Sequence, residues 1–560
     1  MVLLTILFFL PLLASAKSWH SFWYDLGLFG IHPTVSYESF DLQAPELNVI
    51  KSDPRCEDGH ILLTPRGMFY PEPGPLIFDN AGNLVWMENK YGMVMDLKVQ
   101  HYKGRDYLTF WAGEDDGTRG NGQYYMLDSS YEVAHIITAA NGLMGDLHEF
   151  KLTENGTALM TIYEMTPADL TSVGGPSDGW IYDGVFQEVD LETGEVVFQW
   201  RARDHYAVDE AYSPLGDKGR EPTKASAWDY FHINSVDKDA EGNYLVSSRY
   251  MHTLTCVKPS GDLCWVLGGK RNMFQDLSED GSATGFSWQH HARWHPDNIV
   301  TVFDNGADED EITTDHSRGL MISLDLDAMT ATTLQVFNPP DGWLSRSQGS
   351  VQVMPDTGNV FVGWGRTPAW TEFTADGEVL CDVHFSPRWF FRLGWVKSYR
   401  TEKAKWVGTP SYPPTFQLED GGDRLYVSWN GATEVAGWVL QGSGDPHAQD
   451  ADFETLDYIP KTGFETCFDL PQTAHPYLRV AAVGFDGKDL GYTNVFETDP
   501  EYSPSSSSSS FLLFSDMYLP ELLLSSLALA GVFIAIWKSR QLFPSFALVS
   551  RWFTRHNTRF

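Results

Sequence analysis

Positive charge, cysteine and long apolar runs are all scarce in this 560-residue sequence. Lysine and arginine number 39 against 75 aspartate and glutamate residues, which gives a formal net charge of -36 at pH 7. This balance argues against nucleic acid or anionic lipid as the main partner, because both repel an acidic surface. The five cysteines allow at most two internal disulfides. Cys256 and Cys264 flank a Lys-Pro-Ser-Gly-Asp turn, a spacing that places them across a hairpin.

Long apolar runs occur only near the two ends of the chain. The first run ends in Ala14-Ser15-Ala16, a small-x-small cleavage site, so residues 1–16 are predicted to be a signal peptide. The second run predicts a transmembrane helix over residues 517–537. The following tail, 538–560, is basic and is predicted to be cytosolic. A lipid-anchor signal would instead end in its apolar tail. We therefore expect a single-pass type I membrane protein of the secretory pathway, with an extracellular or luminal ectodomain.

Pairs of short hairpins repeat through most of the chain, and no convincing amphipathic helix interrupts them. Six four-stranded units fit between residues 59 and 385. Radial repetition of such units leaves only short, protected edges, which favours a propeller over a sandwich or an open solenoid. The sequence predicts an all-β fold with a six-bladed β-propeller over residues 17–400. The aromatic segment 386–398 is expected to return and close the ring.

The pattern changes after Pro410. Alternating strands over residues 411–498 match the length of a fibronectin-III-like or Ig-like β-sandwich. Residues 499–516 contain a serine run and are predicted to be a polar linker, or stalk, before the membrane segment. The sequon at Asn155 falls in a predicted turn, so the protein is expected to be a glycoprotein.

Three histidines fall at one repeat position, the start of the first strand of successive units. They are His148, His232 and His290. Because the innermost strand of each blade lines the centre of a propeller, these side chains should converge at one end of it. His291 adjoins His290, but alternation along a strand sends neighbours to opposite faces. We expect His290 to face the centre.

Arg249 supplies a positive charge near the histidines. It lies in LVSSRY, on the strand that pairs with the one after His232, and its guanidinium offers a forked donor for a sulfate or carboxylate group. Arg366 occupies a comparable position in the sixth unit and is a weaker candidate.

At these residues the chain resembles the arylsulfate sulfotransferase family over about residues 53–385. The likeness lies in FHINSV with NYLVSSR, in SWQHHARW and in VFDNG at 302–306. It implies that a histidine attacks the sulfur of a phenolic sulfate ester and passes the group to a second phenol, without a nucleotide sulfate donor. By this resemblance His290 is the nucleophile. The other matched residues, which bind the sulfuryl oxygens or protonate the leaving phenol, are His148, His232 and Arg249. The implied partners are small phenolic molecules, and neither cofactor nor metal is implied.

Other functions stay open at this point. A propeller and a sandwich on a stalk are also the layout of a cell-surface receptor or adhesion protein, for which His290 would be dispensable. A glycosidase or lyase would need paired acids, and Asp146 and Asp229 lie near the histidines in sequence. Three histidines also suit a metal hydrolase. The acidic run 308–311 has the residues of a calcium site, but a solvated loop is the much better interpretation.

Overall fold

The structure is a computed structural model and describes residues 19–68, 70–420, 422–471 and 475–497. The predicted signal peptide, polar linker, transmembrane segment and basic tail lie outside these ranges. Within the described ranges, no helix has the length and apolar character needed to cross a bilayer. Residues 19–25 are helical, and strands dominate the rest, so the prediction of an all-β fold is confirmed.

Most described strands belong to six sheets, each built on four antiparallel strands that follow chain order, except that the first sheet begins with β29. The first sheet contains β29 (Lys397–Ala404), β4 (His60–Arg66), β5 (Leu76–Phe78) and β6 (Leu84–Met87). The second contains β7 (Val94–Tyr102), β8 (Arg105–Asp115), β9 (Gly120–Leu127) and β10 (Val133–Ile137). The third contains β11 (Phe150–Leu152), β12 (Thr157–Ala168), β13 (Gly179–Asp190) and β14 (Val196–Arg201), and β15 (Trp228–Asp229) pairs in parallel with β13.

The other three sheets repeat this pattern. The fourth contains β16 (Ile233–Lys238), β17 (Tyr244–Ser248), β18 (Thr253–Val257) and β19 (Leu263–Leu267). The fifth contains β21 (His290–His295), β22 (Ile299–Asp304), β23 (Arg318–Asp325) and β24 (Thr330–Phe337), with β20 (Gln275–Asp276) parallel to β24. The sixth contains β25 (Ser350–Val353), β26 (Val360–Gly363), β27 (Ala369–Phe373) and β28 (Val379–His384), with β3 (Asn48–Lys51) beside β28.

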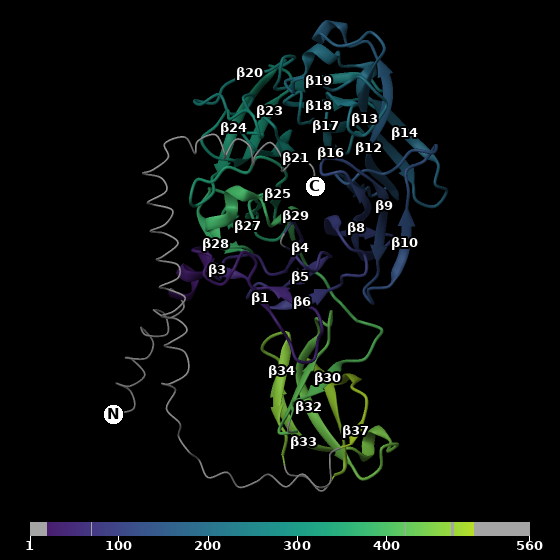
Figure 1. Cartoon of the computed structure of the whole chain (residues 1–560), viewed down its shortest axis with the longest axis vertical. Helices are drawn as coiled ribbons and strands as arrows, with labels where there is room; N and C mark the ends of the chain where they lie inside the picture. The colour runs from purple at the N-terminus through teal and green to yellow at the C-terminus, as the bar shows by residue number, and fades with distance from the viewer. Residues whose placement is uncertain (1–18, 69, 421, 472–474, 498–560) are drawn as a thin grey trace, which may run out of the picture. The chain divides into compact units, whose positions relative to one another are not determined.

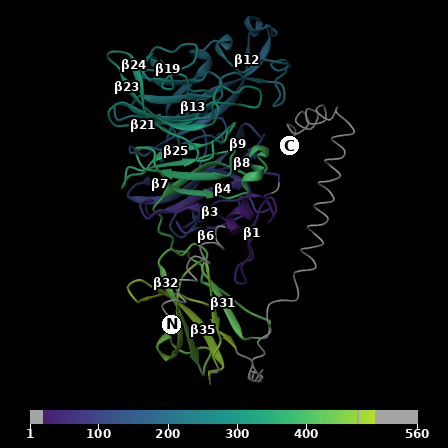
Figure 2. The ribbon, with the colours of Figure 1, turned by 90° about the vertical axis from the view of Figure 1, so that its left-hand side faces the viewer.

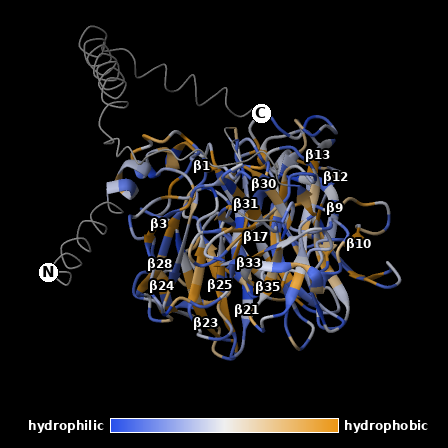
Figure 3. Cartoon of the chain, turned by 90° about the horizontal axis from the view of Figure 1, so that it is seen from below, coloured by the Kyte–Doolittle hydropathy of each residue, from blue (hydrophilic) through white to orange (hydrophobic). Residues whose placement is uncertain are grey.

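The six sheets form a closed ring. Six buried apolar clusters each join one sheet to the next, and one of them joins the sixth to the first. Successive sheets contact one another around the centre: β7 contacts β11, β12 contacts β16, β16 contacts β21, β21 contacts β25, β25 contacts β29, and β29 contacts β7. In Figure 1, β16, β21, β25 and β29 lie toward the middle, and β10, β14 and β24 lie at the periphery. In Figure 3, hydrophobic residues (orange) lie mainly in the strands, and hydrophilic residues (blue) are frequent in the connecting loops.

Segments from both ends of the ring-forming chain complete its closure. β29 pairs with β4, so the first sheet takes its innermost strand from residues that follow the sixth sheet. This differs from the expected return at 386–398. The middle of that segment is the 3-10 helix η4 (Arg388–Leu393), which ends at Gly394 in a left-handed conformation with φ 61°. A disulfide between Cys56 and Cys381 adds a covalent link between the residues before β4 and β28.

The strands after residue 414 form two further sheets. One contains β30 (Thr415–Leu418), β31 (Arg424–Ser428) and β34 (Glu465–Asp469). The other contains β33 (Glu454–Pro460), β32 (Val435–Ser443), β35 (Tyr477–Gly484), β36 (Asp489–Tyr492) and β37 (Phe496–Glu497). Both sheets contribute to one apolar core, centred on Trp438, and Figure 2 shows them as a group of their own.

The remaining described elements are short. β1 (Thr34–Val35) pairs with β2 (Ala44–Pro45). The other 3-10 helices are η1 (Thr171–Val173), η2 (Ala202–Asp204), η3 (Val208–Glu210) and η5 (Asp450–Asp452). The expected Cys256–Cys264 disulfide joins β18 to β19 across their turn, and Cys467 is free and exposed. Asn155 is exposed in the turn between β11 and β12.

Candidate active site

The three histidines selected from the sequence come together at one end of the ring. His148 precedes β11, His232 precedes β16, and His290 begins β21. The ring centroids of His148 and His232 are 5.0 Å apart. The ring of Tyr399, from β29, lies 5.4 Å from His148 and 6.4 Å from His290. Each histidine is at most 3% exposed, so the cluster is buried.

Two of the histidines are held by carboxylates. Nδ1 of His148 lies 2.6 Å from Oδ2 of Asp146, and Nδ1 of His232 lies 2.7 Å from Oδ2 of Asp229. Nη1 of Arg119 donates to the same oxygen of Asp229 at 3.1 Å. Burial alone would raise the pKa of Asp229, but the histidine and the arginine outweigh it and keep the pKa below its usual value. Both aspartates therefore act on histidines, not as a free acid pair.

The third histidine, His290, is held by an amide. Its Nδ1 lies 2.7 Å from Oδ1 of Asn305. Nδ2 of Asn305 donates to the carbonyl oxygens of Ser345 and Gln348, which orients Oδ1 toward the imidazole. An amide oxygen only accepts, so Nδ1 must carry the proton. The backbone N–H of Gln348 donates to Nε2 at 3.3 Å, which agrees with a lone pair there. His290 thus presents an unprotonated Nε2.

The electrostatics of the cluster keep His290 neutral. Burial, followed by the charge of Arg249, lowers its pKa well below 6.5, and the hydrogen bond to Asn305 opposes the shift only in part. Burial also lowers the pKa of His232 to about 4, against the opposing effect of Asp229. At neutral pH in the free protein, both imidazoles are therefore uncharged.

Arg249 directly follows β17 and is 8% exposed. Its Nη2 donates to the carbonyl oxygen of Arg346 at 2.9 Å, and its guanidinium lies 5.2 Å and 5.3 Å from the rings of Tyr250 and Trp288. Its Nε is buried and has no hydrogen-bond partner among the described residues. The guanidinium is thus positioned by aromatic faces while retaining unused donor capacity.

The two alternative candidates lie elsewhere. His291 turns away from the cluster. Its Nδ1 accepts from the backbone N–H of Val351 at 3.2 Å, and its Nε2 is 3.5 Å from Glu402. Arg366 forms an ion pair with Glu309. Neither side chain contacts the three clustered histidines through any described hydrogen bond or ion pair.

Irregular backbone at the strand starts aims these side chains. The pairing register shifts between His290 and Arg293 in β21, and between Ile233 and Ser235 in β16. A bulge adds a residue to one strand and turns its neighbours, which is common beside active sites. His232 and His291 both have φ of 54°, a left-handed conformation that non-glycine residues seldom adopt. This local backbone explains why adjacent His290 and His291 reach different surroundings.

Sequence reasoning missed two members of the cluster. Asn305 lies within VFDNG, one of the segments that carried the family resemblance, so a signal for it was present. The sequence contained no signal for Tyr399, because this residue lies beyond the repeated hairpins and reaches the site only through the pairing of β29 with β4. Its hydroxyl is buried and has no hydrogen-bond partner among the described residues.

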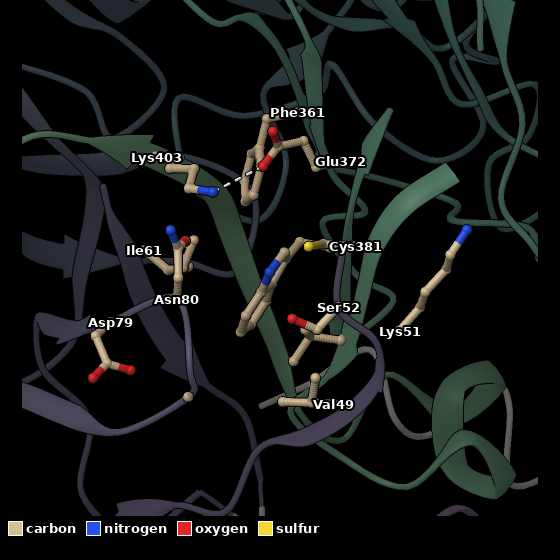
Figure 4. Close-up of a pocket in the computed structure, with 13 residues that line it drawn as sticks. Val49, Lys51, Ser52, Ile61, Asp79, Asn80, Phe361, Glu372, Cys381 and Lys403 are labelled. Atoms are coloured by element: carbon tan, nitrogen blue, oxygen red, sulfur yellow. Dashed lines mark hydrogen bonds and ion pairs between the residues drawn. The ribbon is translucent and has the colours of Figure 1, made fainter. Parts of the chain in front are cut away.

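Two cavities lie outside the cluster. One has a volume of about 20 Å³, enough for a single water molecule, and lies beside the buried ion pair of Lys403 with Glu372 (Figure 4). The other, a cleft of about 410 Å³, is lined by residues that include Arg203, Tyr206 and Tyr230. None of the three histidines lines either cavity. Within the described ranges, no set of three or more His, Cys, Asp or Glu side chains is arranged to hold a metal ion.

Comparison with protein families gives a match over this part of the chain. Residues 98–386, which include all three clustered histidines, Arg249 and Asn305, match the family described as arylsulfotransferase (ASST). The chain belongs to the arylsulfotransferase family. The resemblance predicted from the motifs is thereby confirmed. Tyr399 and the strand β29 lie beyond the matched residues of this arylsulfotransferase-family protein.

Comparisons with individual proteins are less informative. No curated protein matches the chain. A protein of unknown function from Bacteroides caccae has 12% identity and a TM-score of 0.37, and the match covers 62% of this chain and 98% of that one. A catalytically inactive virginiamycin B lyase from Staphylococcus aureus, solved with quinupristin, has 8% identity and a TM-score of 0.31, over 69% and 97% of the two chains. TM-scores this low do not establish a shared fold.

Proposed function

We propose that this protein transfers a sulfuryl group from an aryl sulfate ester to a phenolic acceptor by double displacement through His290. The hydrogen bond between His290 and Asn305 carries the proposal, because it leaves Nε2 unprotonated, with a nucleophilic lone pair that only the long hydrogen bond from Gln348 engages, in a buried, neutral imidazole. The arylsulfotransferase family match supports the type of reaction.

In the first half-reaction, Nε2 of His290 attacks the sulfur of the donor. A nitrogen–sulfur bond forms, the bond from sulfur to the aryl oxygen breaks, and its electron pair leaves with the phenolate. The resulting sulfohistidine keeps the proton on Nδ1, where Oδ1 of Asn305 stabilises the new positive charge of the ring. Because His232 is neutral in the free protein, the pair of His148 and His232 takes up one proton together with the anionic donor, and the leaving phenolate receives that proton.

The second half-reaction reverses these steps with another phenol. The histidine pair accepts the proton of the acceptor hydroxyl, the phenol oxygen attacks sulfur, and the nitrogen–sulfur bond breaks to restore neutral His290. The carboxylates of Asp146 and Asp229 orient the pair and stabilise its charged form. Arg249 would bind the sulfuryl oxygens, for which its unpaired Nε is available.

We test this with 4-nitrophenyl sulfate and the full-length protein. Without acceptor, the wild type is expected to release about one equivalent of nitrophenol per protein in a burst, because the sulfohistidine then accumulates. Added phenol should convert the burst into steady turnover. The His290→Ala variant is expected to lose at least about 10³-fold in rate, as enzymes do without their nucleophile. His291→Ala is the matched control and should retain the burst.

Each other result has a definite meaning. A steady rate of nitrophenol release that does not depend on the phenol concentration indicates a hydrolase. Equal loss in both histidine variants with normal unfolding indicates that the choice of His290 is wrong. No release by folded wild-type protein with any aryl sulfate would overturn the proposal in favour of a non-catalytic receptor or adhesion protein.

We also propose that the ring of sheets is a six-bladed β-propeller and that residues 411–498 form a separate β-sandwich of the fibronectin-III or Ig type. The apolar clusters between successive sheets support the first interpretation, and the shared core around Trp438 supports the second. Blades that each supply one side chain to a common centre also account for the clustering of residues distant in sequence.

For location, we propose the secretory pathway, with the described domains on the extracellular or luminal side and an anchor at 517–537. The two disulfides support this, since such bonds persist in oxidising compartments. The exposed position of Asn155 is compatible with glycosylation.

A further inference from the structure

Two cationic side chains near the histidine end of the ring lack a negative partner. Neither Arg249 nor Lys397 has a carboxylate oxygen within 4.0 Å among the described residues. For Arg249 the proposed function supplies an anion, the sulfuryl group. Lys397 is left without one.

Lys397 occupies an unfavourable place in the sheet. It begins β29 and is the direct cross-strand partner of Arg66, the last residue of β4. Like charges in opposite positions destabilise a sheet. Arg66 is 6% exposed, with Nη1 3.3 Å from Asp115 Oδ2, and its Nε has no hydrogen-bond partner among the described residues. Asp115 is therefore paired with Arg66 and leaves Lys397 without an ion pair.

A third cation, Arg366, lies beside Lys397 and Arg66. The backbone N–H of Ser398 donates to the carbonyl oxygen of Gly365 at 3.3 Å, which places Arg366 next to the start of β29. Arg366 is already paired with Glu309. The group of three cations and two carboxylates keeps an excess positive charge, in a chain whose net charge is -36.

The excess charge is close to the histidines. Lys397 and Tyr399 lie two residues apart on β29, a rise of about 7 Å along a strand. The ring of Tyr399 contacts both His148 and His290. A benzene ring with substituents at both ends has a similar length, so one substrate can reach the histidines and Lys397 together.

We propose that Lys397 and Arg66 form a second anion-binding subsite for the substrate. The preferred donor or acceptor then carries a second anionic oxygen group, such as a carboxylate, phosphate or sulfate, on its aromatic framework. This inference rests on the proposed function for the identity of the first subsite. It narrows the substrate class from phenolic sulfates in general to those that bear a further negative charge.

The titration of Lys397 adds a pH dependence. Arg66, then burial and Arg366, lower its pKa to about 7, against the opposing charges of Asp115 and Glu309. Lys397 is thus mostly charged at pH 6 and mostly neutral at pH 8. Affinity for the second anion should fall as the pH rises through this range, by up to about tenfold if only the charged form binds.

The test uses aryl sulfonates, which resemble the ester but cannot transfer their sulfur. Binding of 4-sulfobenzoate, 3-sulfobenzoate and benzenesulfonate to the full-length protein is measured by calorimetry at pH 6. We expect the sulfobenzoate isomer of higher affinity to bind at least about tenfold more tightly than benzenesulfonate. Lys397→Gln should remove most of that preference. Lys405→Gln, a change just beyond the other end of the same strand where the lysine is exposed, should preserve it.

Binding and turnover separate the two proposals. Equal affinity for all three sulfonates in the wild type would overturn the subsite, even where 4-nitrophenyl sulfate is turned over. A preference that Lys397→Gln and Lys405→Gln reduce equally would also overturn it, since bulk charge explains such a result. A Lys397-dependent preference without any turnover would support the subsite and refute the transferase.

Discussion

The three clustered histidines differ in the side chain that accepts a hydrogen bond from Nδ1. His148 and His232 each face a carboxylate, whereas His290 faces the amide of Asn305. A carboxylate favours the charged imidazolium, but an amide oxygen orients the ring without supplying a full charge. In the proposed mechanism, these partners divide the roles between two proton carriers and one nucleophile, although all three side chains are chemically identical.

The Asn305→Asp substitution tests this division. The new carboxylate should raise the pKa of His290, so that more of the nucleophile is protonated at a given pH. In the wild type, kcat/KM for 4-nitrophenyl sulfate should stay level to well below pH 6.5, because the neutral form of His290 persists there. In the variant, the acidic limb should move up by about one pH unit or more. An unchanged limb would show that Asn305 does not control the protonation of His290.

At the level of elements, strand β29, which lies outside the matched family region, supplies residues to both the histidine cluster and the proposed subsite. β29 closes the first sheet and supplies Tyr399 to the histidine cluster and Lys397 to the proposed subsite. Its pairing with β4 creates the contact between Lys397 and Arg66. A strand that both closes the ring and lines the site couples fold stability to binding.

This coupling predicts that Lys397→Gln stabilises the protein. The change removes a repulsive cross-strand pair, so the midpoint of thermal unfolding should rise at pH 6, where Lys397 is charged. The gain should shrink by pH 8, since the wild-type lysine is then mostly neutral. Differential scanning fluorimetry at both pH values measures the effect. A lower midpoint at pH 6 would mean that Lys397 contributes to the sheet instead of straining it.

For the whole molecule, closure of the ring has a large cost in chain entropy, because it joins the first and sixth sheets, which are far apart in sequence. Cys56 and Cys381 are separated by 325 residues, whereas Cys256 and Cys264 are separated by 8. In the chain-entropy account, stabilisation by a disulfide grows with the logarithm of the loop it closes. The first bond therefore restricts the unfolded chain much more than the second.

Serine variants compare the two bonds. Replacement of Cys56 and Cys381 should lower the unfolding midpoint by roughly twice the amount produced by replacement of Cys256 and Cys264. Cys467→Ser serves as the control, because that thiol is free, and it should leave the midpoint unchanged. Similar losses for both disulfide pairs would show that ring closure by β29 and the apolar clusters is sufficient without the covalent link.

What the sequence determined by itself follows from local and periodic signals. Regular hairpins indicated an all-β fold, and three histidines at one repeat position indicated a convergent cluster with His290 and Arg249. The VFDNG segment contained Asn305, but its role could not be recognised, because a hydrogen bond between residues 15 apart depends on the pairing of β21 with β22.

Tertiary structure alone decided the rest. The return of the chain as β29, the contact of Tyr399 with the histidines and the opposition of Lys397 to Arg66 all require pairing across more than 300 residues. No periodicity within a segment encodes such a pairing. It depends on how six sheets pack around a common centre, since only the completed ring determines which strand must fill the last position.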